Sequence, residues 1–333
     1  MAAGQLWSVN SLGGFYYSLN LSKELRMGVQ ATAKFVQFAD VKDAWGQVTR
    51  SGQTFTWDTV PMMARGNRLL TETNTIPQGQ QTVLQGTLTM YERGFSVPYT
   101  EMLESMSQFN VRNPIMKVLK YDASVDLDAT AWQQFNLTPL KYVSTSSADT
   151  GGATSLTINS VATLTNTSIL SKINVRAIVD TMKGRNIPFY SSDSYYAIGR
   201  PLAFRVLKND MEAIHQYTET GLDMVMNGEV GRYEMTKFVE QTAIPAGGAA
   251  DSTTFDPYAD VADVWNTAGA GDWVFFFGAD TVCEAIHTPT EIRSKIPDDY
   301  GRSKGVAWYA LIGYGITHPD AAQARIVKFD SAV

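Results

Sequence analysis

Apolar and polar residues alternate along two early stretches of the chain, 53–57 and 86–97, and this period of two predicts β-strands. The second stretch reads Thr87, Leu88, Thr89, Met90. Nearly thirty residues separate the two stretches. A structureless connection of that length is unusual in a compact domain. The pattern therefore predicts a long hairpin that projects from the body of the protein.

Residues 113–135 have the pattern of a long helix. Asn113 is a residue type that caps helix N-termini, and Pro114 suits the first helical position, where its missing N–H has no partner to lose. Apolar residues then recur at helical spacing from Ile115 to Phe135. We therefore predict one long helix that begins at Asn113.

Shorter helices are predicted on both sides of it. Residues 168–183 carry an apolar face, and Gly184 can take the left-handed conformation that ends a helix. Pro201 is expected to open a further helix, and a short helix is expected near 30–38.

The remaining strands are spread over the second half of the chain. They are predicted at 195–198, 273–277, 305–316 and 325–329, with polar strands in 136–166 around the loop 144–154. Strands and helices are mixed without the regular alternation of a doubly wound sheet. The predicted fold class is therefore α+β.

The charge of the chain is low and unevenly placed. Charged residues make up 18% of the sequence, where about 25% is typical, which suits either extensive protein contacts or a plain polar surface. The net charge of −6 argues against a dedicated nucleic-acid binder. Residues 1–120 carry 11 Lys and Arg against 8 Asp and Glu, whereas residues 121–333 carry 16 against 25. The first third is therefore expected to be attracted to the remainder of a neighbouring copy.

Cysteine content and hydropathy restrict the class further. Cys283 is the single cysteine, so neither an intramolecular disulfide nor a multi-cysteine metal site is expected. No signal peptide is visible, and the longest apolar stretches, such as 274–277, are too short to span a bilayer. No membrane partner is predicted.

Two groups of residues resemble binding or catalytic sites. His287 and Glu291 are four apart, as two metal ligands on one helix face would be, but Thr288 and Pro289 between them favour a capping box with Glu291. The adjacent carboxylates at 298–299 favour a solvated turn. No nucleophile, phosphate-loop or dinucleotide motif occurs. We predict no catalytic residue, no cofactor and no metal site.

Aromatic residues accompany the projecting segment. They form either one face of an ordinary two-stranded sheet or an interface with a neighbouring chain, and we favour the interface because so long a hairpin has little of its own chain to lie against. The predicted intersubunit contacts are Phe55, Trp57, Arg65, Arg68, Leu88, Met90 and Tyr91.

A glycine-punctuated turn carries the closest resemblance to a known family. Gly228, Glu229, Gly231 and Arg232 lead into a strand, after a strand with Tyr196 and a Pro-initiated helix. This order, and the closing segment 318–325, resembles one branch of the tailed-phage major capsid proteins with the HK97-like fold.

The resemblance implies a division of the whole chain. The implied parts are an N-terminal arm at 1–47, an E-loop hairpin at 48–98, a peripheral domain with a spine helix at 99–166, an axial domain at 167–290, and a return to the peripheral domain at 291–333.

The resemblance also implies a function. Members of the family form hexamers and pentamers that close into an icosahedral phage head around double-stranded DNA. The implied partners are further copies of the chain, a portal, scaffolding or decoration proteins, and DNA contacted non-specifically at the inner wall. The implied location is the virion, assembled in the host cytoplasm. The alternatives are another virion component, such as a tail or adhesin subunit, and a soluble enzyme.

Overall fold

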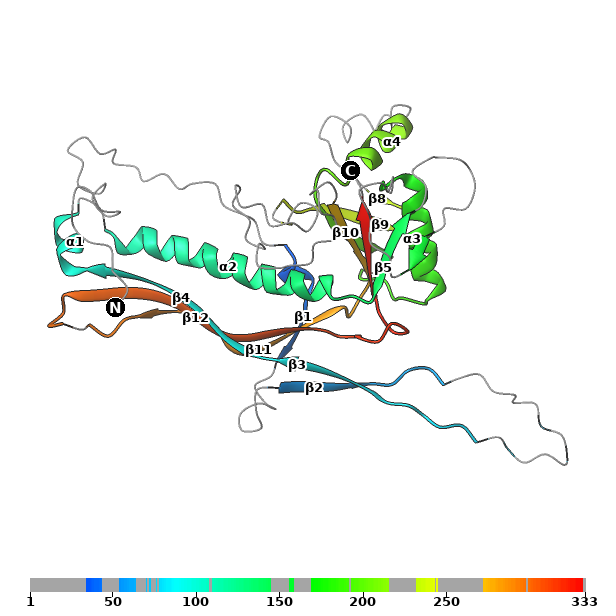
Figure 1. The fold of residues 1–333 in the computed structure, drawn as a ribbon, viewed down its shortest axis with the longest axis horizontal. Coiled ribbons are helices and arrows are strands. Elements are labelled where there is room, and N and C mark those ends of the chain that lie inside the picture. The colour runs from blue at the N-terminus through cyan, green and yellow to red at the C-terminus, as the bar shows by residue number, and fades with distance from the viewer. Residues whose placement is uncertain are drawn as a thin grey trace.

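The computed structural model describes residues 34–43, 54–63, 70, 72, 76, 78–107, 110–144, 156–158, 169–191, 193–215, 232–242, 244, 272–297 and 299–331. These residues form two lobes and a projecting hairpin (Figure 1). One lobe has a long helix on a four-stranded sheet, and the other has a seven-stranded sheet with shorter helices. We call them the long-helix lobe and the seven-stranded lobe.

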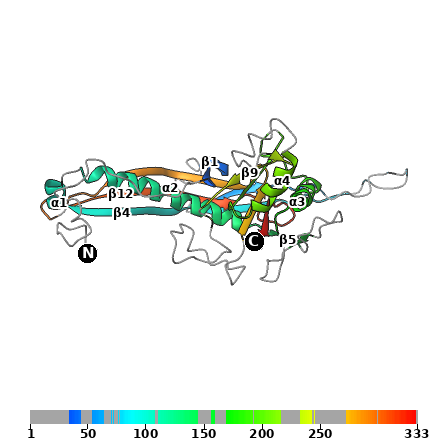
Figure 2. The same cartoon turned by 90° about the horizontal axis from the view of Figure 1, so that it is seen from above.

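The long-helix lobe is elongated and flat (Figures 1 and 2). Its elements are β1 (Asp40–Asp43), β4 (Tyr91–Thr100), α1 (Glu101–Met106), α2 (Arg112–Asn136), β11 (Val282–Ser294) and β12 (Ser303–Ile316). The strand order is β1-β11-β12-β4, in which β1 is parallel to β11 and the other pairs are antiparallel. Leu119 and Ala123 of α2 are buried with Trp308 and Ile312 of β12 in one core.

The long helix is confirmed, but it begins earlier than predicted. It starts at Arg112, where the Asn110 side chain accepts a hydrogen bond from the Arg112 N–H over 3.1 Å. Pro114 therefore occupies the third helical position, which is still inside the first turn and needs no backbone donor. Asn113 is a helical residue and does not cap the helix.

The seven-stranded lobe holds the end of the chain. Its elements are β5 (Leu140–Ser144), β6 (Leu156–Ile158), α3 (Lys172–Gly184), β7 (Tyr195–Gly199), α4 (Arg205–His215), β8 (Arg232–Tyr233), β9 (Thr236–Glu240), β10 (Asp272–Phe277) and β13 (Ile326–Ser331). The strand order is β6-β5-β13-β10-β7-β9-β8. Every residue of β10 and β13 is buried. Val274 and Phe276 belong to the core that contains α3, whereas Phe275 belongs to the core that contains the end of α2.

This topology corrects the expected course of the chain. The closing strand β13, together with β5 and β6, lies in the seven-stranded sheet, whereas we expected these strands in the peripheral domain with the long helix. The physical reason is that every residue of β13 is buried, so both faces of the strand must pack against other parts of the protein. The interior position between β5 and β10 in the larger sheet provides this packing.

Two predicted helix ends also differ. Gly184 is the last residue of α3, and Asn186, with φ of 57°, takes the left-handed position instead. Asn tolerates that conformation better than other non-glycine residues. Pro201 lies in a turn, and α4 begins at Arg205. The short helix expected near 30–38 is described only at Val36–Phe38, as a 3-10 helix.

The capping box expected at Thr288 is wrong. Thr288 and Glu291 lie in the strand β11, where the pairing with β12 shifts register twice. Glu291 pairs with Arg293 instead of a helix N-terminus. The turn expected at 298–301 is confirmed for its described residues, since Asp299, Tyr300 and Gly301 all have positive φ.

Candidate subunit-contact surfaces

The projecting hairpin is built from β2 (Thr54–Thr59) and β3 (Leu84–Thr89), paired antiparallel. Its root is fixed to the body of the protein by Trp57. The Trp57 Nε1 donates a hydrogen bond to the Thr317 carbonyl oxygen over 3.0 Å. The Trp57 ring also covers Gly86, where a Cβ would lie 2.3 Å from the ring. Any larger residue at position 86 would collide with the Trp57 ring in this position.

Leu88 and Met90 contact their own subunit. They are 2% and 1% exposed and pack with Cys283 and Ala285 of β11. Gly313 of β12 makes room for them, because a Cβ there would lie 2.7 Å from the Leu88 side chain. The expectation that Leu88 and Met90 are free for a neighbour is therefore wrong. The stretch predicted as one strand is in fact β3 and β4, which separate at Met90 and enter different sheets.

Beyond its root the hairpin exposes large apolar side chains. Met62 is 94% exposed and Ile76 is 75% exposed, and Val60, Leu70 and Val83 are exposed as well. Figure 1 shows the hairpin extending past the seven-stranded lobe. Arg65 and Arg68 lie outside the described residues. The described part of the same chain leaves these apolar side chains exposed to solvent. Only a partner molecule can therefore bury them.

Tyr91, a predicted subunit contact, and the nearby Phe95 lie on β4. They are 55% and 59% exposed on the edge strand of the four-stranded sheet. Phe55 is partly exposed beside the Leu88 cluster. Within the described part of the chain, the candidate contacts that remain available to a neighbour are Phe55, Tyr91 and, in part, Trp57.

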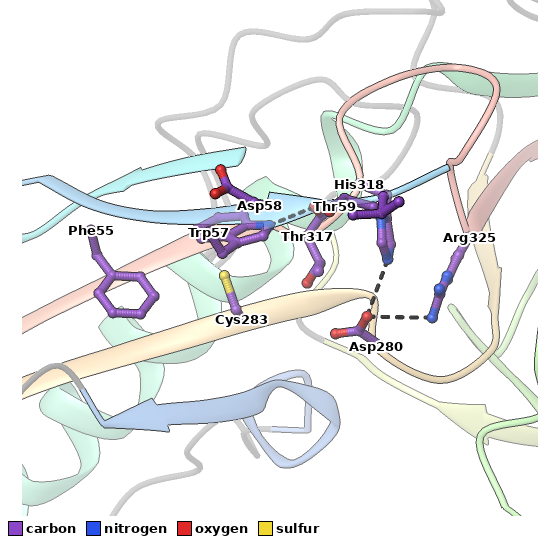
Figure 3. A pocket seen from close by; sticks show the side chains of 10 residues that line it. Phe55, Trp57, Asp58, Thr59, Asp280, Cys283, Thr317, His318 and Arg325 are labelled. Carbon is purple, nitrogen blue, oxygen red and sulfur yellow. Dashed lines mark hydrogen bonds and ion pairs between the residues drawn. The ribbon is translucent and has the colours of Figure 1, made fainter. Parts of the chain in front are cut away.

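A polar cluster joins the hairpin root to both lobes (Figure 3). The Asp280 carboxylate accepts from His318 Nε2 over 3.1 Å and from the Arg325 guanidinium over 3.4 Å. Asp280 lies between β10 and β11, and the other two residues lie between β12 and β13. Both connections cross from one lobe to the other. The cluster therefore fastens the two crossovers to each other, beside a cavity of about 370 Å³ that Trp57 also lines.

A buried carboxylate on the long helix holds two distant segments. Asp128 is fully buried and accepts from the backbone N–H groups of Phe35 and Val36 over 2.6 and 3.1 Å. It also accepts from Gln241 Nε2 over 3.1 Å. Asp128 thereby docks the chain before β1 against the helix and against the end of β9.

Burial raises the pKa of Asp272 to about 6, although the nearby Arg200 guanidinium lowers it. The native state therefore binds a proton at this site at a pH where the unfolded chain does not. Its contribution to the free energy of unfolding rises as the pH falls through about 6, by up to about 3 kcal/mol, and is lost as the pH rises.

We predict that denaturation midpoints of the wild-type subunit increase from pH 7 to pH 5 more than those of the Asp272→Asn variant, which cannot titrate. Equal pH dependence of the two proteins would show that Asp272 is not protonated in this range.

Of the family-like motif, Arg232 is described, whereas Gly228, Glu229 and Gly231 lie outside the described residues. Arg232 pairs with Asp193 over 2.8 Å. Across the described ranges no group of three or more His, Cys, Asp or Glu side chains could hold a metal ion. The helices described are all too short or too polar to cross a bilayer.

Sequence reasoning missed the residues that join the parts. Asp128 gave no local signal, because its partners lie about a hundred residues away on either side. His318 and Arg325 lie in the closing segment 318–325, and Asp280 lies in none of the motifs, so the sequence does not indicate that these three side chains meet. These side chains act through tertiary contacts that no spacing along the chain reveals.

The fold has solved counterparts. The chain is similar to the capsid structure of cyanophage P-SCSP1u, with a TM-score of 0.66 and 11% identity over 95% of this chain and 93% of that one. It is similar to the acidic stable capsid structure of Helicobacter pylori bacteriophage KHP30, with a TM-score of 0.68 and 11% identity over 95% of both chains. The cyanophage Pam1 capsid matches with a TM-score of 0.60 and 14% identity over 100% of this chain and 99% of that one.

A scan against protein-family models finds no match, and a search of curated proteins finds none either. At such low identity the likeness to solved structures establishes the fold. The chain has the mixed α and β architecture of phage capsid structures, the HK97-like fold.

Proposed function

We propose that this chain is the major capsid protein of a tailed bacteriophage, and that copies of it form the hexamers and pentamers of an icosahedral head. The observation that carries the proposal is likeness to phage capsid structures over nearly the full length of both chains. The role is structural, and the mechanism is geometric. Each copy supplies a two-lobed body and an exposed hairpin that a neighbour can cover.

The arrangement of the described residues supports this role physically. Trp57 and the buried Leu88 attach the root of the hairpin to the body of the same subunit. The free subunit therefore already fixes where the hairpin leaves the body. The arm beyond the root exposes apolar side chains, and burying each of them stabilises a contact by roughly 1.5–3 kcal/mol. Repetition of one such contact between identical subunits produces closed symmetric assemblies.

The proposal also includes the partners of the assembled protein. A head of this kind would enclose double-stranded DNA, contacted non-specifically, and would meet a portal and scaffolding or decoration proteins while assembling in the host cytoplasm. A tail or adhesin subunit would be expected to show repeated β modules, which the long helix α2 does not favour. A soluble enzyme would need a convergent polar site, and the Asp280 cluster instead fastens two lobe connections.

Self-association tests the proposal. Sedimentation velocity over a rising protein concentration should show monomer converting to rings or closed particles. A compact monomer at every concentration, in every salt and with crowding agents, would contradict it.

Salt dependence reports on the first encounter between subunits. If the basic first third meets the acidic remainder of another copy, raising the ionic strength from low to about 0.5 M should slow early assembly measured by light scattering, because exposed charges are screened beyond about 10 Å or less. Assembly that only accelerates with salt would show that burial of apolar surface governs the encounter.

A further inference from the structure

Residues 34–43 lie where the two lobes meet and contact both of them (Figure 1). We call this segment the strap. It consists of the 3-10 helix Val36–Phe38, the residues around it and the strand β1. Its first half packs against the seven-stranded lobe, and its second half pairs with β11 of the long-helix lobe. A change in the angle between the lobes must therefore alter the contacts at one end of the strap.

The first half of the strap is attached to the seven-stranded lobe by an aromatic side chain and a cation. Phe38 is buried, and its ring centroid lies 5.2 Å from that of Phe277 in β10 and 5.2 Å from that of Tyr196 in β7. The Lys34 ammonium donates a hydrogen bond to the carbonyl oxygen of Glu240, the last residue of β9. These contacts fix the first half of the strap against three strands of the seven-stranded lobe.

The second half of the strap is attached to the long-helix lobe through its backbone. The strand β1 runs parallel to β11, with Asp40 opposite Cys283 and Asp43 opposite Ile286. A paired strand cannot slide gradually, because a shift by one residue turns every side chain to the other face of the sheet. This end of the strap therefore moves together with β11.

Phe35 lies between the long helix and the seven-stranded sheet. Its side chain is fully buried, and its ring centroid lies 5.4 Å from that of Phe135 in α2 and 6.1 Å from that of Phe275 in β10. Protein interiors are close-packed, so a ring enclosed between two elements sets the distance between them. The strap therefore separates α2 from β10 as well as connecting the lobes.

Asp128 of α2 holds the strap in this position. Its carboxylate accepts hydrogen bonds from the N–H groups of Phe35 and Val36 over 2.6 and 3.1 Å. It also accepts from the side chain of Gln241 over 3.1 Å, and the Gln241 N–H donates to the Gly199 carbonyl oxygen at the end of β7 over 2.9 Å. One buried carboxylate thus connects the long helix, the strap and the seven-stranded sheet.

The chain itself crosses between the lobes at 137–139, 278–281 and 317–325. Asp280 fastens the last two of these crossovers to each other. Short connections between packed bodies are where hinge motions occur, because a few residues there absorb the change in backbone angle. The crossovers keep the lobes joined, whereas the strap bears on both lobes and opposes rotation about the crossovers.

We propose that the strap, held by Asp128, fixes the angle between the two lobes, and that its release allows the lobes to take other angles. Packed interfaces change between discrete arrangements, so loss of one contact set permits a different angle and not merely a looser fit. The consequence for assembly rests on the proposed function. In a closed head the angle between the lobes contributes to the curvature of the shell, so a narrow range of angles favours particles of uniform size.

A distance between labels on the two lobes tests the proposal in the unassembled subunit. In a Cys283→Ala background, spin labels are attached at Asp180→Cys on α3 and Phe95→Cys on β4, both at exposed positions on regular elements. Pulsed electron paramagnetic resonance then measures the distribution of distances between the labels. We expect one narrow distribution in this labelled parent protein. Adding Asp128→Ala or Phe38→Ala should shift or broaden it.

Two further variants serve as controls. Asp126→Ala changes a carboxylate on the same helix that pairs with Arg93 and not with the strap, so it should leave the distribution unchanged. Asp128→Asn keeps the oxygen that accepts from both strap N–H groups, so its distribution should stay close to that of the parent. Near-UV circular dichroism shows which variants keep a packed core, and Phe38→Ala decides the test if Asp128→Ala does not fold.

The outcomes separate the strap from the proposed function. Parent-like distances in folded Asp128→Ala and Phe38→Ala subunits, or a broad distribution in the parent, would overturn the strap whether or not the protein assembles. Variants with altered distances should form particles of more variable diameter than the wild type in electron micrographs, and uniform particles would overturn the link to curvature. Wild-type protein that never assembles would overturn the proposed function, while the distances would still decide the role of the strap.

Discussion

Replacing Asp128 by alanine is expected to lower the free energy of unfolding of the unassembled subunit by about 3–5 kcal/mol. The carboxylate is fully buried and accepts from two backbone N–H groups and one side-chain amide. Without the carboxylate these buried donors lose that acceptor, and the backbone at Phe35 and Val36 loses its hydrogen bonds to α2. Chemical denaturation of the purified subunit measures the change.

Asp126→Ala is the matched control, two residues away on the same helix. Its carboxylate forms a partly exposed ion pair with Arg93, which is worth only about 0–1 kcal/mol. A loss below about 1 kcal/mol for Asp128→Ala, or equal losses for the two variants, would show that the buried hydrogen bonds do not hold the segment in place.

Shortening the hairpin is expected to abolish assembly while leaving the subunit folded. Thr59 lies opposite Leu84 in the register, so an Asn-Gly turn can replace residues 60–83 and close the two strands directly. The described residues of this segment are mostly exposed, and the buried Leu88 and the Trp57 seat remain. The thermal midpoint should therefore change little, whereas particles should be absent at concentrations where the full chain assembles.

Trypsin provides the companion measurement on the full chain. Cleavage at Arg65 and Arg68 is expected to be rapid in the free subunit and slow in the assembled one. The described residues on either side of them, Met63 and Leu70, are exposed, and exposed segments are the preferred sites of proteolysis until a partner covers them. Equal cleavage in both states, or a shortened protein that assembles normally, would show that the hairpin does not contribute to the contact between subunits.

The sequence predicted those helices and strands whose hydrophobic pattern lies within the element itself. The long helix has its own apolar period from Ile115 to Phe135, and the buried strand β10 has its own apolar run, so both are found with small shifts at their ends. The projecting hairpin follows from the same kind of argument, since its two alternating strands are separated by a connection too long for a compact domain.

What the sequence could not predict depends on tertiary partners. The alternation through Leu88, Met90 and Tyr91 is continuous, yet the chain passes at Met90 from one sheet to another. The residues at 288–291 match a helix start, but pairing with β12 extends the strand through them. Whether Leu88 faces a neighbour or its own subunit depends on Gly313 and Gly315, which are more than two hundred residues away.

Negative-stain electron microscopy of the purified protein, concentrated until sedimentation shows large species, tests the central claim most directly. The account predicts rings of five or six subunits and closed shells of uniform size, in which each arm lies on an adjacent body. Particles without order, or a field of single compact subunits under every assembly condition, would contradict it.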